Sequence, residues 1–385
     1  MTPVTGHTFL GAGPAPGTHR ARTLQSRKSF VRPGNGFTLH CGNVLEAYEQ
    51  WPAPDLIVSD GAYGVLGFRG DTVSASELGE WYRPHIAEWS RLAKPSTSLW
   101  FWNTEVGWAN VHPQLEAAGW DYVELVTWDK GLSHIAGNVN SQTIRQIPVV
   151  TEVCALYRRR VELPTGDGRL LPVKEWLRHE WQRSGLPLNR ANEACRVRNA
   201  ATRKYLTQDW LWYWPPGEMV ERMSRYAKRF GKLSARPYFS LDGTTAVTAE
   251  TWDALRSTWN HEHGVTNVWH RPPLADAERL KGTMKRSAPR TYKPTRTSAA
   301  HLNQKPLEFM AREVAMASNE GDIVWEPFGG LGSASVAAVG LGRQAYVAEI
   351  DPTFQELAFE RLEIASSERA TESHETAPSR TGVRA

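Results

Sequence analysis

The chain has 385 residues, of which 41% are apolar and 22% charged, and its formal net charge is +4. These values are typical of a globular protein and exclude a collagen-like, fibrous or largely disordered chain. Because a typical domain has roughly 100–200 residues, we expect one catalytic domain and a sizeable insert.

The sequence shows neither a targeting signal nor a metal-binding pattern. No apolar run approaches the roughly 20 residues that span a bilayer, and the first residues lack the pattern of a signal peptide, so the cytoplasm is the expected compartment. Cys41, Cys154 and Cys195 lie far apart and form no pair with zinc spacing. We therefore predict no disulfide and no metal site.

The first part of the chain alternates strands and helices. Residues 1–33 are rich in Gly, Pro, Thr and Arg without periodicity, and we expect them to be disordered. Within 34–160, apolar runs predict strands at 56–59, 98–102 and 122–128, and a helical pattern covers 78–92. This alternation predicts an α/β domain with a parallel or mixed sheet.

The middle of the chain, 161–298, is expected to be a mainly helical insert. Its segment 188–206 has the spacing of a helix-turn-helix, with a small Ala191, a turn near Arg196 and inward-facing Val197 and Leu206. An ordinary helical hairpin with a basic face is the alternative. In the DNA-binding interpretation, four residues face a groove or its phosphates: Asn199, Thr202, Arg203 and Lys204. A basic stretch at 281–296 fits either phosphate contacts or a solvated linker.

The α/β rhythm returns in 299–365. We predict helices at 307–317, from 333 and from 353, and strands at 323–326 and 345–349; the polar residues 366–385 are expected to be disordered. The strand at 323–326 ends in Glu326, and a glycine-rich turn follows it. Glycines there allow positive φ and close approach of a ligand to the backbone. The dinucleotide fingerprint GxGxxG fails, because Ser335 stands where its last glycine is required.

An acidic residue follows this turn at a spacing that suggests nucleoside binding. Glu349 ends the next predicted strand, about 20 residues after the glycines, where a carboxylate can bond ribose hydroxyls. A surface carboxylate is the alternative. A second buried strand delivers Asp60 at its carboxyl end, and Tyr63 follows three residues later. An acid and a ring this close can bond an amino group and stack on a flat base.

Together these stretches resemble the amino-methyltransferases of DNA, whose catalytic motif is [DNS]PP[YFW] and whose cofactor motif is an acidic-Pro-Phe-x-Gly-x-Gly turn. Three segments match the family in this order: residues 60–63, residues 301–306 with their Lys-Pro pair, and residues 326–332. The catalytic motif precedes the cofactor motif, which is the permuted β arrangement. The resemblance implies a Rossmann-like methyltransferase fold that binds S-adenosylmethionine and double-stranded DNA, with the insert as the target-recognition region.

The resemblance also implies residue roles. Asp60 and the Gly61 carbonyl accept the hydrogens of the base amine, and Tyr63 stacks on the base after it leaves the duplex. The implied cofactor contacts are Asn43, Lys305, Glu326, Phe328, Gly330, Gly332 and Glu349. The chain departs from the family where Gly61-Ala62 replaces Pro-Pro, and this change removes preorganisation of the loop.

The sequence leaves open which base is methylated and whether the substrate is DNA. An initial Asp is commoner among adenine-N6 enzymes, whereas 145–153 and the insert resemble cytosine-N4 enzymes, which we favour. C5-methylation would require a cysteine nucleophile, usually after proline, and no cysteine here follows one. The alternatives are an RNA or protein methyltransferase and a DNA-binding protein with an inactive core. We expect the chain to be either a solitary enzyme or the modification half of a restriction system, whose partner endonuclease acts separately.

Overall fold

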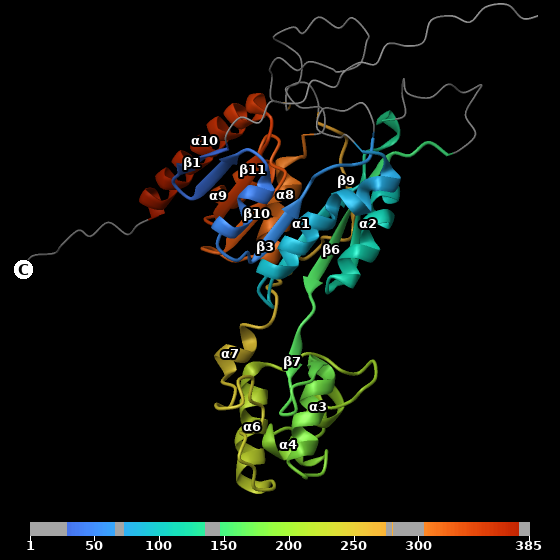
Figure 1. Cartoon of the computed structure of the whole chain (residues 1–385), viewed down its shortest axis with the longest axis vertical. Helices are drawn as coiled ribbons and strands as arrows, with labels where there is room; N and C mark the ends of the chain where they lie inside the picture. Colours follow the sequence, from blue (N-terminus) through green and yellow to red (C-terminus); the bar gives the residue numbers. More distant parts are fainter. Residues whose placement is uncertain (1–28, 66–72, 135–146, 275–278, 280–303, 377–385) are drawn as a thin grey trace, which may run out of the picture.

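The computed structural model describes residues 29–65, 73–134, 147–274, 279 and 304–376, and these form an α/β domain and a helical lobe (Figure 1). Within them, a nine-stranded sheet contains β1 (Phe30–Gly34), β2 (Phe37–Cys41), β3 (Leu56–Ser59), β4 (Ser98–Asn103), β5 (Trp120–Asp129), β6 (Thr151–Arg159), β9 (Val268–His270), β10 (Ile323–Glu326) and β11 (Gln344–Glu349). The helices around it are α1 (Leu78–Leu92), α2 (Glu105–Ala117), α8 (Leu307–Ala317), α9 (Ser333–Gly340) and α10 (Pro352–Thr376). Short 3-10 turns cover Val44–Glu46, Tyr48–Gln50, Ala75–Glu77 and Leu132–His134.

The strand order is β1-β2-β11-β10-β3-β4-β6-β5-β9. Strands β2, β11, β10, β3 and β4 are parallel, β6 runs antiparallel to both of its neighbours, and β9 is parallel to β5. The carboxyl ends of β3, β4, β5, β10 and β11 therefore lie at the same edge of the sheet as the amino end of β6. We call this the carboxyl edge. Ligands of open α/β sheets bind at this edge.

Alternating side chains give the sheet two apolar faces. In β4, Trp100 and Trp102 belong to the apolar cluster of α8, α9 and α10, whereas Leu99 and Phe101 belong to that of α1 and α2. This is the two-residue period of a strand that is covered by helices on both sides. The expected α/β class with a mixed sheet is confirmed. Strands β3 and β10 are adjacent although the insert separates them in sequence.

The structure differs from the expected disorder at both chain ends. Strand β1 begins at Phe30 and pairs with β2, and α10 continues to Thr376. Tertiary contacts hold these segments: the Arg32 guanidinium lies 3.6 Å from the centre of the Phe359 ring, and Ser366 Oγ donates to the Asn35 carbonyl at 2.8 Å. Local composition carries no information on such contacts. The rest of 1–33 and 366–385, like the basic stretch 281–296, lies outside the described residues.

The insert forms its own lobe below the sheet (Figure 1). It contains the two-stranded sheet of β7 (Glu162–Pro164) and β8 (Leu170–Pro172) and the helices α3 (Val173–Arg183), α4 (Arg190–Ala194), α5 (Ala200–Tyr205), α6 (Gly217–Phe230) and α7 (Ala249–Asp253). Its separate apolar core includes Trp176, Trp181 and Trp252, all fully buried. The range 161–298 also contains β9, which pairs with β5 in the large sheet.

A buried carboxylate ties the lobe together. Glu180 is fully buried and accepts hydrogen bonds from Arg183 at 2.8 Å, Arg236 at 3.2 Å and the backbone N–H of Phe239 at 2.8 Å. We expect Glu180→Gln to destabilise the lobe by about 2–4 kcal/mol, because the buried carboxylate loses its charge and two half-buried cations lose their counter-charge. Urea unfolding followed by tryptophan fluorescence measures the change. Glu175→Gln, an exposed residue of the same helix, is the control; equal stability of the two variants would contradict the prediction.

Candidate functional site

Four charged groups and one tyrosine meet at the carboxyl edge. Asp60 and Tyr63 follow β3, and Lys130 follows β5. Glu152 is the second residue of β6, and Lys305 lies just before Pro306, the N-cap of α8. We call these five residues the catalytic cluster, because Asp60 and Tyr63 belong to the expected catalytic motif. Glu152 reaches this edge because β6 is antiparallel to its neighbours, so its first residues lie beside the last residues of β4 and β5.

The catalytic cluster is closely hydrogen-bonded. Lys305 Nζ lies 2.8 Å from Asp60 Oδ1, 2.8 Å from Glu152 Oε1 and 2.9 Å from the Tyr63 hydroxyl. The Tyr63 hydroxyl lies 2.7 Å from Asp60 Oδ1 and 2.6 Å from Glu152 Oε1. Lys130 Nζ pairs with the other oxygen of Glu152 at 2.7 Å. Within the described residues, Asp60 Oδ2 has no hydrogen-bond partner and is the open acceptor of the cluster.

Opposite charges offset the cost of burial in the cluster. Burial alone would raise the pKa of Glu152, but Lys305 and Lys130 lower it to about 2. Burial alone would lower the pKa of Lys305, but Asp60 and Glu152 raise it above its usual value. Burial and the two carboxylates raise the pKa of Tyr63. At neutral pH, Lys305 is therefore a cation, Glu152 an anion and Tyr63 a neutral donor.

The Gly61-Ala62 loop is held without the two prolines of the family motif. The Ala62 carbonyl accepts hydrogen bonds from Asn103 Nδ2 at 2.9 Å and from the Tyr82 hydroxyl at 3.1 Å. A Cβ atom on Gly61 would lie 2.6 Å from both Phe328 Cδ2 and the Tyr82 hydroxyl. The Gly61 carbonyl accepts no hydrogen bond within the described residues. Tertiary contacts thus supply the rigidity that proline rings supply elsewhere.

These contacts predict that restoring the family motif is harmful. We expect Gly61→Pro to reduce the activity that the resemblance implies, methyl transfer to DNA, about 10-fold or more, because the added ring atoms displace Phe328 or Tyr82 and move Asp60. The initial rate on duplex DNA measures this effect. Gly340→Ala, at the end of α9 with nothing near the added carbon and no left-handed φ, is the control. A Gly61→Pro variant as fast as wild type would contradict the steric argument.

The glycine turn after β10 makes a second polar site at the carboxyl edge. Gly330 and Gly332 adopt φ of 53° and 66°, and Gly332 is the N-cap of α9. Glu326 is buried, and its oxygens accept from the N–H groups of Ala334 at 3.1 Å and Ser335 at 2.7 Å. Burial raises the pKa of Glu326 to about 7. Its observed contacts are therefore with the first turn of α9.

Glu349 is half-buried beside this turn. Its carboxylate accepts hydrogen bonds from the backbone N–H groups of Gly330 at 2.7 Å and Asp351 at 2.6 Å. Burial raises the pKa of Glu349 to about 7. Each oxygen still has a lone pair for another donor. The carboxylate and the left-handed turn together suit a ribose and the backbone-facing part of a nucleoside ligand.

The other predicted cofactor residues occupy different positions. Asn43 is exposed, and its Oδ1 accepts a hydrogen bond from the backbone N–H of Leu45 at 3.1 Å. The residue before it, Gly42, donates its N–H to the Glu349 carbonyl at 2.9 Å. Phe328 packs with four aromatic rings of α1, those of Trp81, Tyr82, His85 and Trp89. Lys305 contacts Asp60 and Glu152 in the catalytic cluster.

Sequence reasoning missed three residues of this site: Lys130, Glu152 and Asn103. Glu152 stood in the stretch 145–153 that the sequence singled out, but with no role of its own. The direction of β6 brings Glu152 to the site, and no local pattern reveals that direction. Asn103 ends a strand in the same manner as Asp60, so its position after β4 was a usable signal.

The hairpin predicted at 188–206 exists as α4 and α5, joined through Arg196 at φ 56°. Asn199, Arg203 and Lys204 are exposed. Thr202 is half-buried, and its hydroxyl donates to the Leu188 carbonyl at 2.8 Å. The two helices therefore present an amide and two cations to solvent, while the Thr202 hydroxyl stabilises the hairpin.

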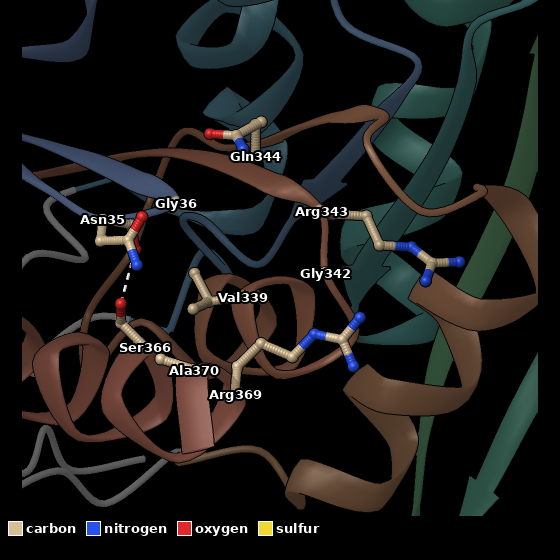
Figure 2. Close-up of a pocket in the computed structure, with 9 residues that line it drawn as sticks. All are labelled: Asn35, Gly36, Val339, Gly342, Arg343, Gln344, Ser366, Arg369 and Ala370. Carbon is tan, nitrogen blue, oxygen red and sulfur yellow. Dashed lines mark hydrogen bonds between the residues drawn. The ribbon is translucent and has the colours of Figure 1, made fainter. Parts of the chain in front are cut away.

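A hollow opens at the opposite edge of the sheet from the catalytic cluster (Figure 2). Figure 2 shows the Arg343 guanidinium pointing away from the Ser366–Asn35 hydrogen bond, and this guanidinium donates to the Ser318 carbonyl at 2.6 Å. The hollow is lined by Asn35, Gly36, Val339, Gly342, Arg343, Gln344, Ser366, Arg369 and Ala370. The hollow therefore belongs to a different part of the fold.

Among the described residues, no helix is long and apolar enough to cross a membrane.

One protein family matches most of the chain, and one curated relative matches a short part of it. The sequence profile of a family described as DNA methylase, of the N6 and N4 type, matches residues 55–360. A DNA adenine methyltransferase, YhdJ of Escherichia coli strain K12, is 33% identical over 82 residues, which are 21% of this chain. The matched segment spans only 28% of that enzyme.

Solved structures give more distant similarities. The M1.HpyAVI complex with S-adenosylmethionine has a TM-score of 0.44 and 13% identity, with 85% of this chain and 98% of that chain covered. The cytosine-N4-specific PvuII DNA methyltransferase has a TM-score of 0.45 and 11% identity, with 87% of this chain and 92% of that chain covered.

Proposed function

Because the chain belongs to the N6 and N4 DNA methylase family, we propose that it transfers the methyl group of S-adenosylmethionine to an exocyclic amino group of a base in double-stranded DNA. The observation that supports this activity most strongly is the pair of open acceptors at the carboxyl edge. Asp60 Oδ2 and the Gly61 carbonyl have no partner within the described residues, while the groups around them are hydrogen-bonded.

These acceptors address the weak nucleophilicity of a base amine. The lone pair of the amine is delocalised into the ring, so the nitrogen reacts only when its hydrogens are held out of the ring plane. Asp60 Oδ2 and the Gly61 carbonyl can accept both hydrogens, and the fixed loop holds these acceptors in place. Lys305 and Tyr63 hold Asp60 Oδ1, so the carboxylate keeps one orientation. Asp60 can then receive the proton that the methylated nitrogen releases.

The turn after β10 fits the cofactor. Glu349 would hold the ribose hydroxyls, and Gly330 and Gly332 would allow the ligand to approach the backbone closely. Phe328 and Asn43 would border this site. When bound, S-adenosylmethionine supplies an electrophilic methyl group on a sulfonium. Strands β3 and β10 are neighbours, so the catalytic cluster and the glycine turn lie at adjacent strand ends.

We propose that the insert lobe binds DNA. Residues 161–258 contain 16 Lys and Arg against 11 Asp and Glu, whereas the whole chain has 45 against 41. The lobe therefore carries the excess positive charge that suits phosphates. Asn199, Arg203 and Lys204 are the proposed contacts, and Trp210, which is 88% exposed, lies on the loop after α5. The target base must leave the duplex to reach the catalytic cluster, and the Tyr63 ring is its proposed stacking surface.

For the target base, we propose N4 of cytosine, with N6 of adenine as the alternative. The sequence resemblance favours N4 of cytosine, whereas the relative from Escherichia coli is named a DNA adenine methyltransferase. In a cell without a nucleus, a DNA substrate would place the protein in the cytoplasm. A restriction endonuclease that acts separately is the proposed partner if the enzyme belongs to a restriction system.

Transfer of a labelled methyl group tests the substrate class. The full chain is incubated with labelled S-adenosylmethionine and, in separate reactions, mixed-sequence duplex DNA, RNA and soluble protein. We expect label in DNA alone. Label in RNA or protein with none in DNA would overturn the proposed substrate. Cofactor binding without transfer to any of them would instead support an inactive, DNA-binding core.

A further inference from the structure

We propose that Glu152 is a positioning residue for methyl transfer: it shares the Tyr63 hydroxyl and the Lys305 ammonium with Asp60, and so keeps Asp60 able to accept from the base amine. This inference rests on the proposed function. It concerns a residue on a different strand from the catalytic motif, 89 positions after Tyr63 in the sequence.

The Tyr63 hydroxyl is shared between two carboxylates. It lies 2.6 Å from Glu152 Oε1 and 2.7 Å from Asp60 Oδ1, and it accepts from Lys305 at 2.9 Å. A phenol has one hydrogen, so it donates to one carboxylate at a time. Glu152 therefore competes with Asp60 for this hydrogen. Without Glu152, Tyr63 would donate to Asp60 continuously and weaken it as an acceptor.

Lys305 is shared in the same way. Its ammonium has three hydrogens, and its three acceptors are Asp60, Glu152 and the Tyr63 hydroxyl. The side chain is 3% exposed, so water does little to screen its charge. If Glu152 lost its charge, the whole field of Lys305 would act on Asp60. Both effects of Glu152 have the same sign: they preserve the ability of Asp60 to accept hydrogen from the amine.

The fold fixes Glu152 in this role. Its Oε2 pairs with Lys130 Nζ at 2.7 Å, so each of its oxygens has a cation partner. Strand β6 lies between β4 and β5, and Glu152 pairs with Trp128 of β5. The Trp128 ring in turn lies 4.8 Å from Lys130 Nζ. The carboxylate is thus held through Oε2, which leaves Oε1 to contact Tyr63 and Lys305.

A double-mutant cycle tests whether Glu152 acts through Tyr63. Single-turnover methyl transfer is measured for wild type, Glu152→Gln, Tyr63→Phe and the double variant. We expect Glu152→Gln alone to slow transfer about 10-fold or more, and to slow it by a clearly smaller factor in the Tyr63→Phe background, where only the effect through Lys305 remains. Glu116→Gln, a half-exposed residue of α2, is the matched control. Independent, multiplicative losses would overturn the inference, as would a Glu152→Gln variant as fast as wild type.

A second readout does not require activity. The chain contains 11 tyrosines, and the ring carbon that bears the Tyr63 hydroxyl can be assigned by its absence from the ¹³C spectrum of Tyr63→Phe. We expect this resonance to shift in Glu152→Gln and to stay in place in Glu116→Gln. A resonance unmoved in folded Glu152→Gln would overturn the shared hydrogen bond. If Glu152→Gln does not fold, Glu152→Asp, which keeps the charge but withdraws the carboxylate, takes its place in both measurements.

The two readouts separate the inference from the function. Wild type without transfer to DNA would refute the proposed function, and positioning for methyl transfer would fall with it even if the resonance moved. Wild type with transfer, together with an additive cycle or an unmoved resonance, would refute only the role of Glu152.

Discussion

Asp60→Asn should reduce the rate of methyl transfer to DNA about 10³-fold while leaving cofactor affinity nearly unchanged. An amide keeps the size of the side chain but loses the charge, and its NH₂ group cannot accept a hydrogen from the amine. It also presents a donor or a neutral oxygen to Lys305, which is 2.8 Å from Asp60 Oδ1 in the native cluster. Single-turnover kinetics with saturating cofactor measure the chemical step.

The control for this variant is Asp121→Asn. Asp121 lies on β5, is about half-exposed and pairs with Arg160, so the same chemical change occurs away from the cluster. Calorimetric titration of S-adenosylmethionine should give similar affinities for wild type and both variants. If Asp60→Asn retained more than about a tenth of the wild-type rate, Asp60 would not be the acceptor that the reaction depends on.

Cofactor affinity should increase as the pH rises through about 7. Burial raises the pKa of Glu349 to about 7, so the carboxyl is largely protonated at pH 6 and largely ionised at pH 8. The ionised form is the stronger acceptor for ribose hydroxyls. Binding that requires this form should therefore strengthen about 10-fold between pH 6 and pH 8, because the ionised fraction rises by about that factor. Calorimetric titration at several pH values measures the change.

Glu349→Gln separates this effect from that of a neighbouring acid. Burial also raises the pKa of Glu326 to about 7, but Glu326 bonds the first turn of α9. We expect Glu349→Gln to bind the cofactor about 10- to 100-fold more weakly at pH 8 and to lose most of the pH dependence. A dependence that survives unchanged in this variant would assign it to Glu326 and contradict the role given to Glu349.

The sequence predicted those parts of the site that lie in one continuous segment. Asp60 and Tyr63 are three residues apart on one loop, and Gly330 precedes the strand of Glu349 at the expected spacing, so local patterns were sufficient. The strand and helix ranges of the α/β domain followed from apolar periodicity for the same reason. Family membership then confirmed the resemblance that these motifs carried.

The parts that depend on long-range pairing could not be predicted. Glu152 enters the site because β6 is antiparallel between β4 and β5, and Lys305 joins Asp60 across 245 positions. The stability of the Gly61-Ala62 loop depends on Phe328 and Tyr82, which are distant in sequence. The contact between the Arg32 guanidinium and the Phe359 ring holds the N-terminal strand β1, whose composition suggested disorder. In each case tertiary contacts outweigh the local signal.

Mass spectrometry of the nucleosides from methylated DNA tests the central claim most directly. Duplex DNA of mixed sequence is treated with the full chain and S-adenosylmethionine, digested to nucleosides and compared with DNA treated with Asp60→Asn. Methylation at an exocyclic amine predicts N4-methylcytosine or N6-methyladenine with wild type, nearly absent with the variant, and the product identifies the base. Methyl groups found only on ring atoms such as C5 of cytosine, or no methylated nucleoside from a chain that binds the cofactor, would contradict it.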